Sequence, residues 1–317
     1  AEPCGRFVGS WNRPILSGAG GARRSIVNIN GAARDFTLRN LVLRDGDQLL
    51  DPNSYGGALD ITGGPHQVEI ENVAFTQNVA GYGGAISVRG TRTPGGIVPT
   101  STVHIKDQVT VSGNRSAYGG GGVYCSQANL FIQGLNSFVN GNIAGGAVDP
   151  GETPPAAGGV HGGGLRLTEC EARIAIPSIA ANEASGDGGG IAALFNSTRL
   201  EIGNLTPTNP TRIAGNISGG YGGGIYLLRG AEAVLNDSIV EDNTARGGGG
   251  GIAMVNLDEG QPLTFTSLTM TSSFNETSGR ARCRSDIECN VIRNNEAYDG
   301  ATPKIGAALL ISQTTAN

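Results

Sequence analysis

Short runs in which apolar and polar residues alternate recur along the whole chain. Clear examples are "QVEIENVAF" at residues 67–75, "STVHIKDQVTV" at 101–111 and "AEAVLNDSIV" at 231–240. A period of two with many β-branched residues is typical of β-strands that are buried on one side. No stretch of about a dozen residues keeps the helical period of about 3.6 with caps at its ends. The pattern therefore predicts an all-β chain of short strands joined by sharp bends.

A repeated motif ties these runs together. Seven segments read apolar, any, any, Asn, any, and then Ala or Ser. Most are followed by two or more glycines and an apolar run, such as "GGGLRL" at 162–167 and "GGGIYLL" at 222–228. A degenerate copy precedes them, with "LRDG" at 43–46 and "GGALDI" at 56–61. The repeated asparagines are Asn78, Asn114, Asn142, Asn182, Asn216, Asn243 and Asn295.

The spacing of these asparagines ranges from 27 to 52 residues. A short fixed unit with variable insertions is typical of a solenoid, in which the insertions emerge as loops. A unit of two or three strands cannot bury its own apolar side, whereas stacked units can. We therefore predict a right-handed, single-stranded parallel β-helix with loop insertions between its coils. At about 27 residues per coil, the chain would form about eleven coils.

The asparagines and glycines have predicted structural roles in such a stack. Asn and Gly tolerate the positive φ that sharp bends between sheets require. Asn at one turn position of every coil could hydrogen-bond to its equivalents above and below, which would satisfy buried backbone groups. The Ala or Ser two residues later would fit a tight corner. Glycines would let the backbones of adjacent coils approach closely.

The stretch "FTQNVAGYGGAI" at 75–86 carries a resemblance to a known family. It resembles the paired FxxN and GGA[ILV] motifs of the polymorphic outer membrane protein repeats of chlamydial autotransporter adhesins. The other copies have Ile or Val where this family has Phe. The resemblance covers about residues 25–311 and implies a right-handed parallel β-helix, extracellular display, and adhesive or structural roles.

The expected organisation is one β-helix domain over residues 1–317, as part of a longer chain. Residues 1–24 would form an N-terminal cap or lead-in, and residues 25–311 would form the stacked coils. Residues 272–289 would be a loop insertion, closed by a disulfide between Cys283 and Cys289. Cys125 and Cys170 are candidates for a bridge between neighbouring units, and five buried thiols are the alternative interpretation. Disulfides indicate an oxidising compartment.

Six N-x-[ST] sequons are present. Asn114 and Asn216 occupy the repeated turn position, where a ladder role would disfavour a glycan. The sequons outside that register are the predicted glycosylation sites in a eukaryotic secretory protein. They are Asn196, Asn204, Asn236 and Asn275.

Composition and charge narrow the classes of function. Among 317 residues, 53 are glycine, and the formal net charge is −5, which offers no basic patch for nucleic acid. No run approaches 18 apolar residues, so no transmembrane helix is expected. The glycine runs lack the "GK[ST]" of a phosphate loop, and "SGDGGGI" at 185–191 is no calcium repeat. We expect no cofactor and no metal site, and we expect partners among protein chains and cell-surface glycans, with self-assembly as a further option.

Catalysis is the alternative, because many β-helices are polysaccharide lyases or hydrolases. Glycoside hydrolysis needs two carboxylates at a defined separation. The candidate acids do not recur with His or Arg in a pectin-cleaving pattern, and His161 in "VHGGGL" is more simply a turn histidine. We therefore predict a cell-surface structural or adhesive module without catalysis, or a filament subunit. The candidate acids are Asp187, Asp237, Glu241, Asp242, Asp258 and Glu259.

Overall fold

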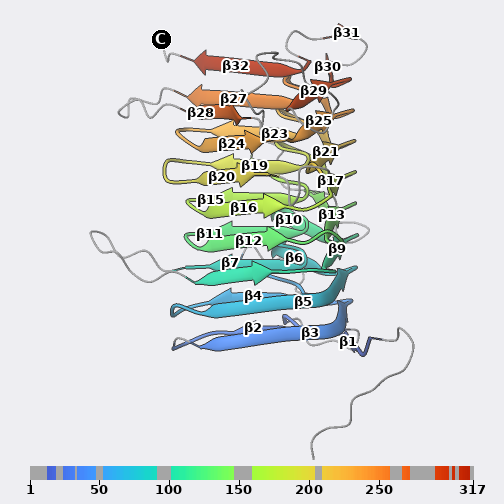
Figure 1. Cartoon of the computed structure of the whole chain (residues 1–317), viewed down its shortest axis with the longest axis vertical. Helices are drawn as coiled ribbons and strands as arrows, with labels where there is room; N and C mark the ends of the chain where they lie inside the picture. Colours follow the sequence, from blue (N-terminus) through green and yellow to red (C-terminus); the bar gives the residue numbers. More distant parts are fainter. Residues whose placement is uncertain are drawn as a thin grey trace, which may run out of the picture.

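A stack of flat β-coils makes up the molecule (Figure 1), seen in a computed structural model. The coils follow the order of the sequence along the long axis of the stack. The structure describes residues 13–18, 24–32, 34–47, 53–90, 101–145, 159–203, 209–257, 266–271, 290–299, 302–303 and 307–314. Within these ranges there are strands and no α-helix, and none of them contains a helix that could cross a membrane.

Sheet A is the largest of three sheets and has 15 strands. Its early strands β3 and β5 are ten residues long, whereas each later coil enters the sheet as two shorter strands. The first series is β1 (Ile15–Ser17), β3 (Asp35–Arg44), β5 (Gln67–Thr76), β8 (Thr102–Ile105), β12 (Asn129–Gln133), β16 (Glu171–Ala175), β20 (Arg199–Ile202), β24 (Glu232–Asn236) and β28 (Ser267–Thr271). The second series is β9 (Thr110–Ser112), β13 (Phe138–Asn140), β17 (Ser178–Ala180), β21 (Arg212–Ala214), β25 (Ile239–Glu241) and β29 (Val291–Arg293).

Sheets B and C complete each coil. Sheet B contains β2 (Val27–Ile29), β4 (Leu59–Thr62), β7 (Ile86–Arg89), β11 (Val123–Ser126), β15 (Leu165–Thr168), β19 (Ile191–Leu194), β23 (Ile225–Leu228), β27 (Ile252–Leu257) and β32 (Leu309–Thr314). Sheet C contains β6 (Val79–Tyr82), β10 (Arg115–Gly119), β14 (Ile143–Ala144), β18 (Glu183–Ala184), β22 (Ile217–Ser218), β26 (Thr244–Ala245), β30 (Glu296–Asp299) and β31 (Thr302–Pro303). Only β30 and β31 pair antiparallel among the described strands.

The parallel register confirms the predicted β-helix. Each coil pairs residue for residue with the next one, as in the match of Val123 with Leu165 between β11 and β15. Sheet B receives one strand from each coil and has nine strands in the described part of the chain. In the described part of the chain these nine coils are fewer than the about eleven expected from the sequence.

The core lies inside the coils and consists of columns of apolar side chains. One column in sheet B runs through successive strands, and each of its members is fully buried. Stacked units thus bury the side that a single unit would expose, which explains the period of two in the strands. The members of this column are Ile61, Val88, Cys125, Leu167, Ala193 and Leu227.

Candidate functional site

The seven repeated asparagines lie directly above one another at the bend between sheets A and C. Six of their side chains are fully buried, and Asn295 is 8% exposed. The Ala or Ser that follows two residues later is also buried at each position. The motif of the sequence therefore corresponds to one continuous internal column, which we call the asparagine ladder.

Each step of the ladder repeats the same hydrogen bonds. The side-chain Nδ2 of Asn182 donates to Oδ1 of Asn216 at 3.0 Å, and the backbone N–H of Asn182 donates to the same oxygen at 3.0 Å. Nδ2 of Asn182 also donates to the carbonyl of Val139 in the preceding coil at 2.9 Å. Buried polar groups are costly unless they are paired, and the ladder pairs them at every bend.

The bend itself differs from the prediction in one detail. Positive φ was expected at the repeated asparagines, but it belongs to the residue just before each of them, such as Ala181 with φ 53° and Asp242 with φ 54°. The asparagines themselves do not have positive φ. This expectation was wrong because the side-chain amide must point along the stack, so the preceding residue takes the strained conformation.

Glycine runs form a second bend, between sheets C and B. A glycine at or near the start of each run has positive φ, as at Gly188 with φ 71°. A Cβ on the next glycine, Gly189, would lie 2.5 Å from the carbonyl oxygens of Gly223 and Ile217. The N–H groups of Gly188 and Gly189 donate to carbonyls of the next coil at 2.9 and 3.1 Å. Glycine is therefore required at Gly189, because neighbouring backbones touch there.

Tyrosines gather on the outside of this glycine bend. Residues just before the glycine runs form one outward column, and alternate residues of sheet B form a second column beside it. Five of the seven tyrosines of the chain lie in these two columns, and a sixth, Tyr118, directly precedes Gly119 of the first column. We call this surface the tyrosine corner. Its tyrosines are Tyr55, Tyr82, Tyr118, Tyr124, Tyr221 and Tyr226.

Four of these rings pack against one another. The ring centroid of Tyr82 lies 5.4 Å from that of Tyr55, 5.4 Å from that of Tyr118 and 5.1 Å from that of Tyr124. All four residues are half-buried, and burial raises the pKa of the Tyr82 hydroxyl. Aromatic pairs of this geometry stabilise a structure by more than the burial of their apolar surface alone would. The cluster is therefore a preorganised surface.

Two arginines lie against these rings. The guanidinium carbon of Arg89 lies 3.6 Å from the ring centroid of Tyr55, and that of Arg166 lies 5.4 Å from the centroid of Tyr82. Arg89 is neutralised by Asp60, with Nη2 and Oδ2 2.9 Å apart. Burial raises the pKa of Asp60 more than Arg89 lowers it. The corner thus combines aromatic faces with guanidinium groups, a cation–π arrangement.

A histidine and an aspartate continue the first column. Nδ1 of His161 lies 3.2 Å from Oδ2 of Asp187, and the other oxygen of Asp187 accepts the backbone N–H of Tyr221 at 2.8 Å. The ring of His161 stacks at 5.9 Å on that of Tyr226, whose pKa burial raises strongly. The structure thus places His161 at a turn, next to one of the candidate acids.

The other candidate acids are dispersed. Glu241 is buried between Arg212 and Arg293, with Nε of Arg293 at 2.8 Å. Asp237 is also buried, and Asp242 lies at the ladder bend with positive φ. Asp258 and Glu259 lie outside the described residues. Among the described residues, no cluster of three His, Cys, Asp or Glu could hold a metal ion.

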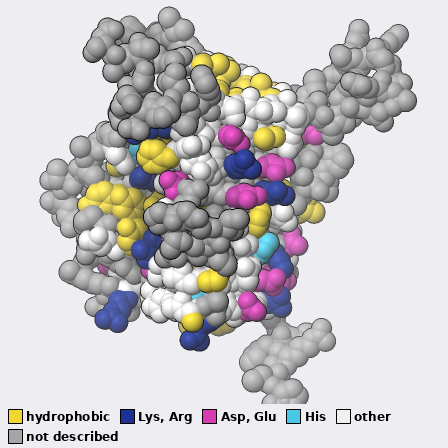
Figure 2. All heavy atoms as spheres, turned by 90° about the vertical axis from the view of Figure 1, so that its left-hand side faces the viewer, with side chains coloured by type: hydrophobic (Ala, Val, Ile, Leu, Met, Phe, Trp, Pro, Cys, Tyr) yellow, Lys and Arg dark blue, Asp and Glu magenta, His cyan; other side chains and the backbone are white. Residues whose placement is uncertain are grey.

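The outer face of sheet A carries ion pairs. A hollow of about 270 Å³ is lined by Glu171, Arg173, Arg199, Glu201 and Glu232, together with Ala172, Leu200 and Val234. Arg173 lies 3.4 Å from Glu201, and Arg199 lies 3.4 Å from Glu232. Figure 2 shows basic and acidic side chains intermixed along one flank of the molecule. Each carboxylate of the hollow has a guanidinium partner, so the hollow resembles a mixed-charge surface more than an acid–base pair.

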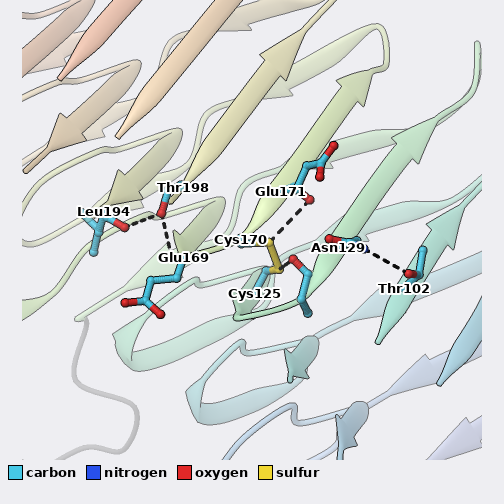
Figure 3. Close-up of a disulfide and its surroundings, with 9 residues drawn as sticks. Thr102, Cys125, Asn129, Glu169, Cys170, Glu171, Leu194 and Thr198 are labelled. Carbon is cyan, nitrogen blue, oxygen red and sulfur yellow. Dashed lines mark hydrogen bonds between the residues drawn. A yellow bond between two sulfur atoms is a disulfide. The ribbon is translucent and has the colours of Figure 1, made fainter. Parts of the chain in front are cut away.

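A disulfide joins Cys125 in β11 to Cys170, just before β16 in the next coil (Figure 3). Both sulfur-bearing residues are fully buried, and 45 residues separate them in sequence. Thr198, one coil further on, accepts the backbone N–H of Glu169 at 2.7 Å and so holds the turn next to Cys170. Cys4, Cys283 and Cys289 lie outside the described residues.

The predicted glycosylation sites have different surroundings. Asn196 lies exposed in a turn, and Asn236 is half-buried at the end of β24. Asn204 and Asn275 lie outside the described residues. Asn114 and Asn216 are fully buried, and Nδ2 of each makes two hydrogen bonds.

Sequence reasoning missed the tyrosine corner. The signal was present, because an aromatic, His or Asp residue stands just before most glycine runs. It becomes visible only when coils of different length are aligned on their glycines.

Two segments of the chain, residues 72–89 and 108–126, match the Chlamydia polymorphic membrane protein repeat. Over these two segments the chain is similar to the polymorphic membrane protein repeat. Each matched segment contains a ladder asparagine, Asn78 or Asn114, and the glycine bend that follows it. Polymorphic membrane protein repeats belong to a family of surface-exposed outer membrane proteins. No curated protein and no solved structure matches the chain.

Proposed function

We propose that the chain is an extracellular, cell-surface β-helix module that acts by adhesion and has no catalytic activity of its own. The tyrosine corner is the observation that carries this proposal. Tyr and Arg are the residue types that dominate binding hot spots, and here half-buried members of both types are gathered on one outward-facing surface. The repeat family adds support, because its members are surface proteins.

The hydrogen-bonded stack suits such a role mechanically. Ladder and strand hydrogen bonds connect every coil to the next, so side chains on one column are held in fixed register. Binding to a preorganised surface loses little conformational entropy. Exposed Asn196 is our preferred glycan acceptor if the chain passes through a glycosylating secretory pathway.

Cell binding tests the adhesive proposal. Beads coated with the full chain should bind cultured animal cells, whereas beads coated with reduced and unfolded chain should not. Incubation with polygalacturonate should release no unsaturated or reducing ends. Cleavage of this or another glycan would overturn the non-catalytic part, and equal binding by folded and unfolded chain would overturn the adhesive part.

A filament subunit is the second candidate, favoured by the last strands of the stack. Within the described part of the chain, β28 and β32 are paired on one side only. Met270 in β28 is 49% exposed, and Ile311 in β32 is 71% exposed. Unpaired strand edges favour strand addition. Electron microscopy and sedimentation over a range of protein concentration would show fibres or higher oligomers if this candidate is correct.

A further inference from the structure

We propose that the tyrosine corner around Arg166 binds a negatively charged saccharide, with the carboxylate on Arg166 and the sugar hydroxyls on the tyrosine hydroxyls. This inference rests on the proposed adhesive function, because it names the ligand class and the surface that would provide it. It concerns Arg166 and the four packed tyrosines Tyr55, Tyr82, Tyr118 and Tyr124.

Arg166 occupies a gap in the tyrosine column. Gly119 pairs with Tyr82 and with His161 in the column, but it has no side chain. A Cβ on Gly119 would lie 2.8 Å from Cδ of Arg166 and 3.0 Å from its Nη1, so the arginine lies over this glycine. The long side chain therefore reaches from sheet B into the space that the glycine leaves.

The charge of Arg166 has no acidic partner among the described residues. Its Nη1 donates to the backbone carbonyls of Tyr118 at 2.8 Å and Gly159 at 3.3 Å. Its Nε is buried and lacks a hydrogen-bond partner. Burial lowers the pKa of Arg166, although a guanidinium remains charged at neutral pH. A partly desolvated cation without a counter-charge is unfavourable, so a carboxylate from a ligand would be attracted to it.

Arg89 is the internal comparison. It lies against the same tyrosine cluster, yet its Nη2 donates to both carboxylate oxygens of Asp60, at 3.2 and 2.9 Å. One guanidinium of the cluster is thus matched by a carboxylate of the chain, and the other is not. Arg166 is accordingly the position for an external anion.

The phenol hydroxyls provide the second part of the site. Within the described part of the chain, the hydroxyl groups of Tyr55, Tyr82, Tyr118 and Tyr124 have no hydrogen-bond partner. Each can both donate and accept, as sugar hydroxyls can. Successive coils repeat at about 4.8 Å, which is close to the rise of one sugar in an extended polysaccharide. Tyr55 and Tyr82 lie on successive coils, as do Tyr124 and Arg166 beside them, so an acidic polysaccharide running along the stack would meet these groups at intervals close to one sugar unit.

An acidic peptide fits this surface less well. Peptides commonly dock by adding a strand to a free sheet edge or by filling side-chain pockets. The backbone N–H groups of Gly120 and Gly121 already donate to His161 and Gly162 of the next coil, at 3.0 and 3.1 Å. The corner offers hydroxyls, aromatic rings and one guanidinium without an acidic partner, and these are groups that recognise a charged sugar.

Calorimetric titration of the full chain tests the proposal. The probes are tetragalacturonate and 3′-sialyllactose as acidic saccharides, lactose as a neutral one, and a poly-glutamate peptide. Wild type should bind an acidic saccharide, bind lactose at least tenfold more weakly, and lose affinity as salt is raised. Arg166→Gln should weaken binding about tenfold or more, and Tyr82→Phe, which removes one hydroxyl, about threefold.

Arg173→Gln is the matched control, because Arg173 lies on the outer face of sheet A and should leave binding unchanged. Thermal unfolding would establish that each variant is folded, and Tyr82→Phe retains the packed ring if Arg166→Gln is unstable. Absence of binding to both acidic probes, equal binding by Arg166→Gln, or tighter binding of poly-glutamate would overturn the proposal. Cell binding that persists in Arg166→Gln would leave the adhesive function standing without this site, whereas loss of all cell binding in wild type would remove the adhesive function itself.

Discussion

A single ladder asparagine satisfies several buried groups at once. Oδ1 of Asn182 accepts the backbone N–H and the Nδ2 of Asn142, both at 3.0 Å, while its own Nδ2 serves Asn216 and Val139. No other side chain of similar size provides an acceptor and two donors in this plane. Asn is therefore specified by hydrogen bonding and not by the backbone conformation of its own residue.

Asn182→Ala should destabilise the chain by at least about 3 kcal/mol, because it leaves several buried groups unpaired. Urea denaturation followed by circular dichroism would measure the change. Asn129→Ala is the control, because Nδ2 of half-buried Asn129 makes one long hydrogen bond of 3.3 Å to Thr102. This substitution should lower the free energy of unfolding by less than about 0.5 kcal/mol. Similar losses for both variants would contradict the structural role of the ladder.

Glu241 should make the free energy of unfolding depend on pH in the acidic range. Burial tends to raise its pKa, but hydrogen bonds from Arg293 and Arg212 outweigh burial and lower it below the ordinary value of 4.5. The native pKa is thus below that of the unfolded chain, so the stabilisation is present above about pH 4.5 and is lost as the pH falls through the native pKa.

Glu241→Gln should therefore lower stability at pH 7 and reduce its further fall between about pH 5 and pH 3. Glu232→Gln, at an exposed ion pair with Arg199, is the control and should keep the wild-type acid dependence. Urea denaturation at several pH values gives both curves. An unchanged acid profile in Glu241→Gln would refute the assignment.

At the scale of the element, the glycine bend is set by contact between backbones. The coil containing Gly189 lies so close to the next that a methyl group has no room. The repeat of glycine runs was readable from sequence for this reason, since steric exclusion leaves no alternative residue.

Gly189→Ala should cost about 3 kcal/mol or more, through displacement of the adjacent coils. Gly203→Ala is the matched control, because the nearest atom to its Cβ would be 3.9 Å away. That variant should be neutral or slightly stabilising in the same denaturation assay. If Gly189→Ala were equally tolerated, the coils could not be as closely packed as the structure shows.

The disulfide is expected to restrict the unfolded chain. Closure of a loop whose ends are 45 positions apart in sequence is worth about 4 kcal/mol in the chain-entropy description. Replacement of Cys125 and Cys170 together by Ala should lower the free energy of unfolding by about 2–5 kcal/mol. The free energy of unfolding of oxidised wild type should also be compared with that of wild type reduced by dithiothreitol, because both forms keep the sulfur atoms in the core. Non-reducing peptide mapping would establish that the disulfide is present in the first form and absent from the second. Equal stability of the two forms would exclude a stabilising role.

At the scale of the whole molecule, fold and chemistry differ in how far the sequence predicts them. The β-helix was predictable because strand period, ladder asparagine and glycine run recur in every unit and agree with one another. The corner around Arg166 was not, because Gly119, Tyr82 and Arg166 come from three different coils. The positive φ at Ala181 was hidden as well, since only three of the seven residues before the ladder asparagines are glycine and the others are of different types.

The ladder also gives the stack a net dipole along its long axis. From Asn78 to Asn243, every side-chain amide directs one N–H toward the oxygen of the next ladder asparagine, and from Asn114 to Asn295 every amide oxygen accepts from the preceding one. Amide dipoles aligned head to tail add up, as they do along an α-helix. The two ends of the column therefore carry partial charges of opposite sign, negative beside Asn78 and positive beside Asn295. Two such columns placed end to end attract each other when they point the same way and repel when they are reversed.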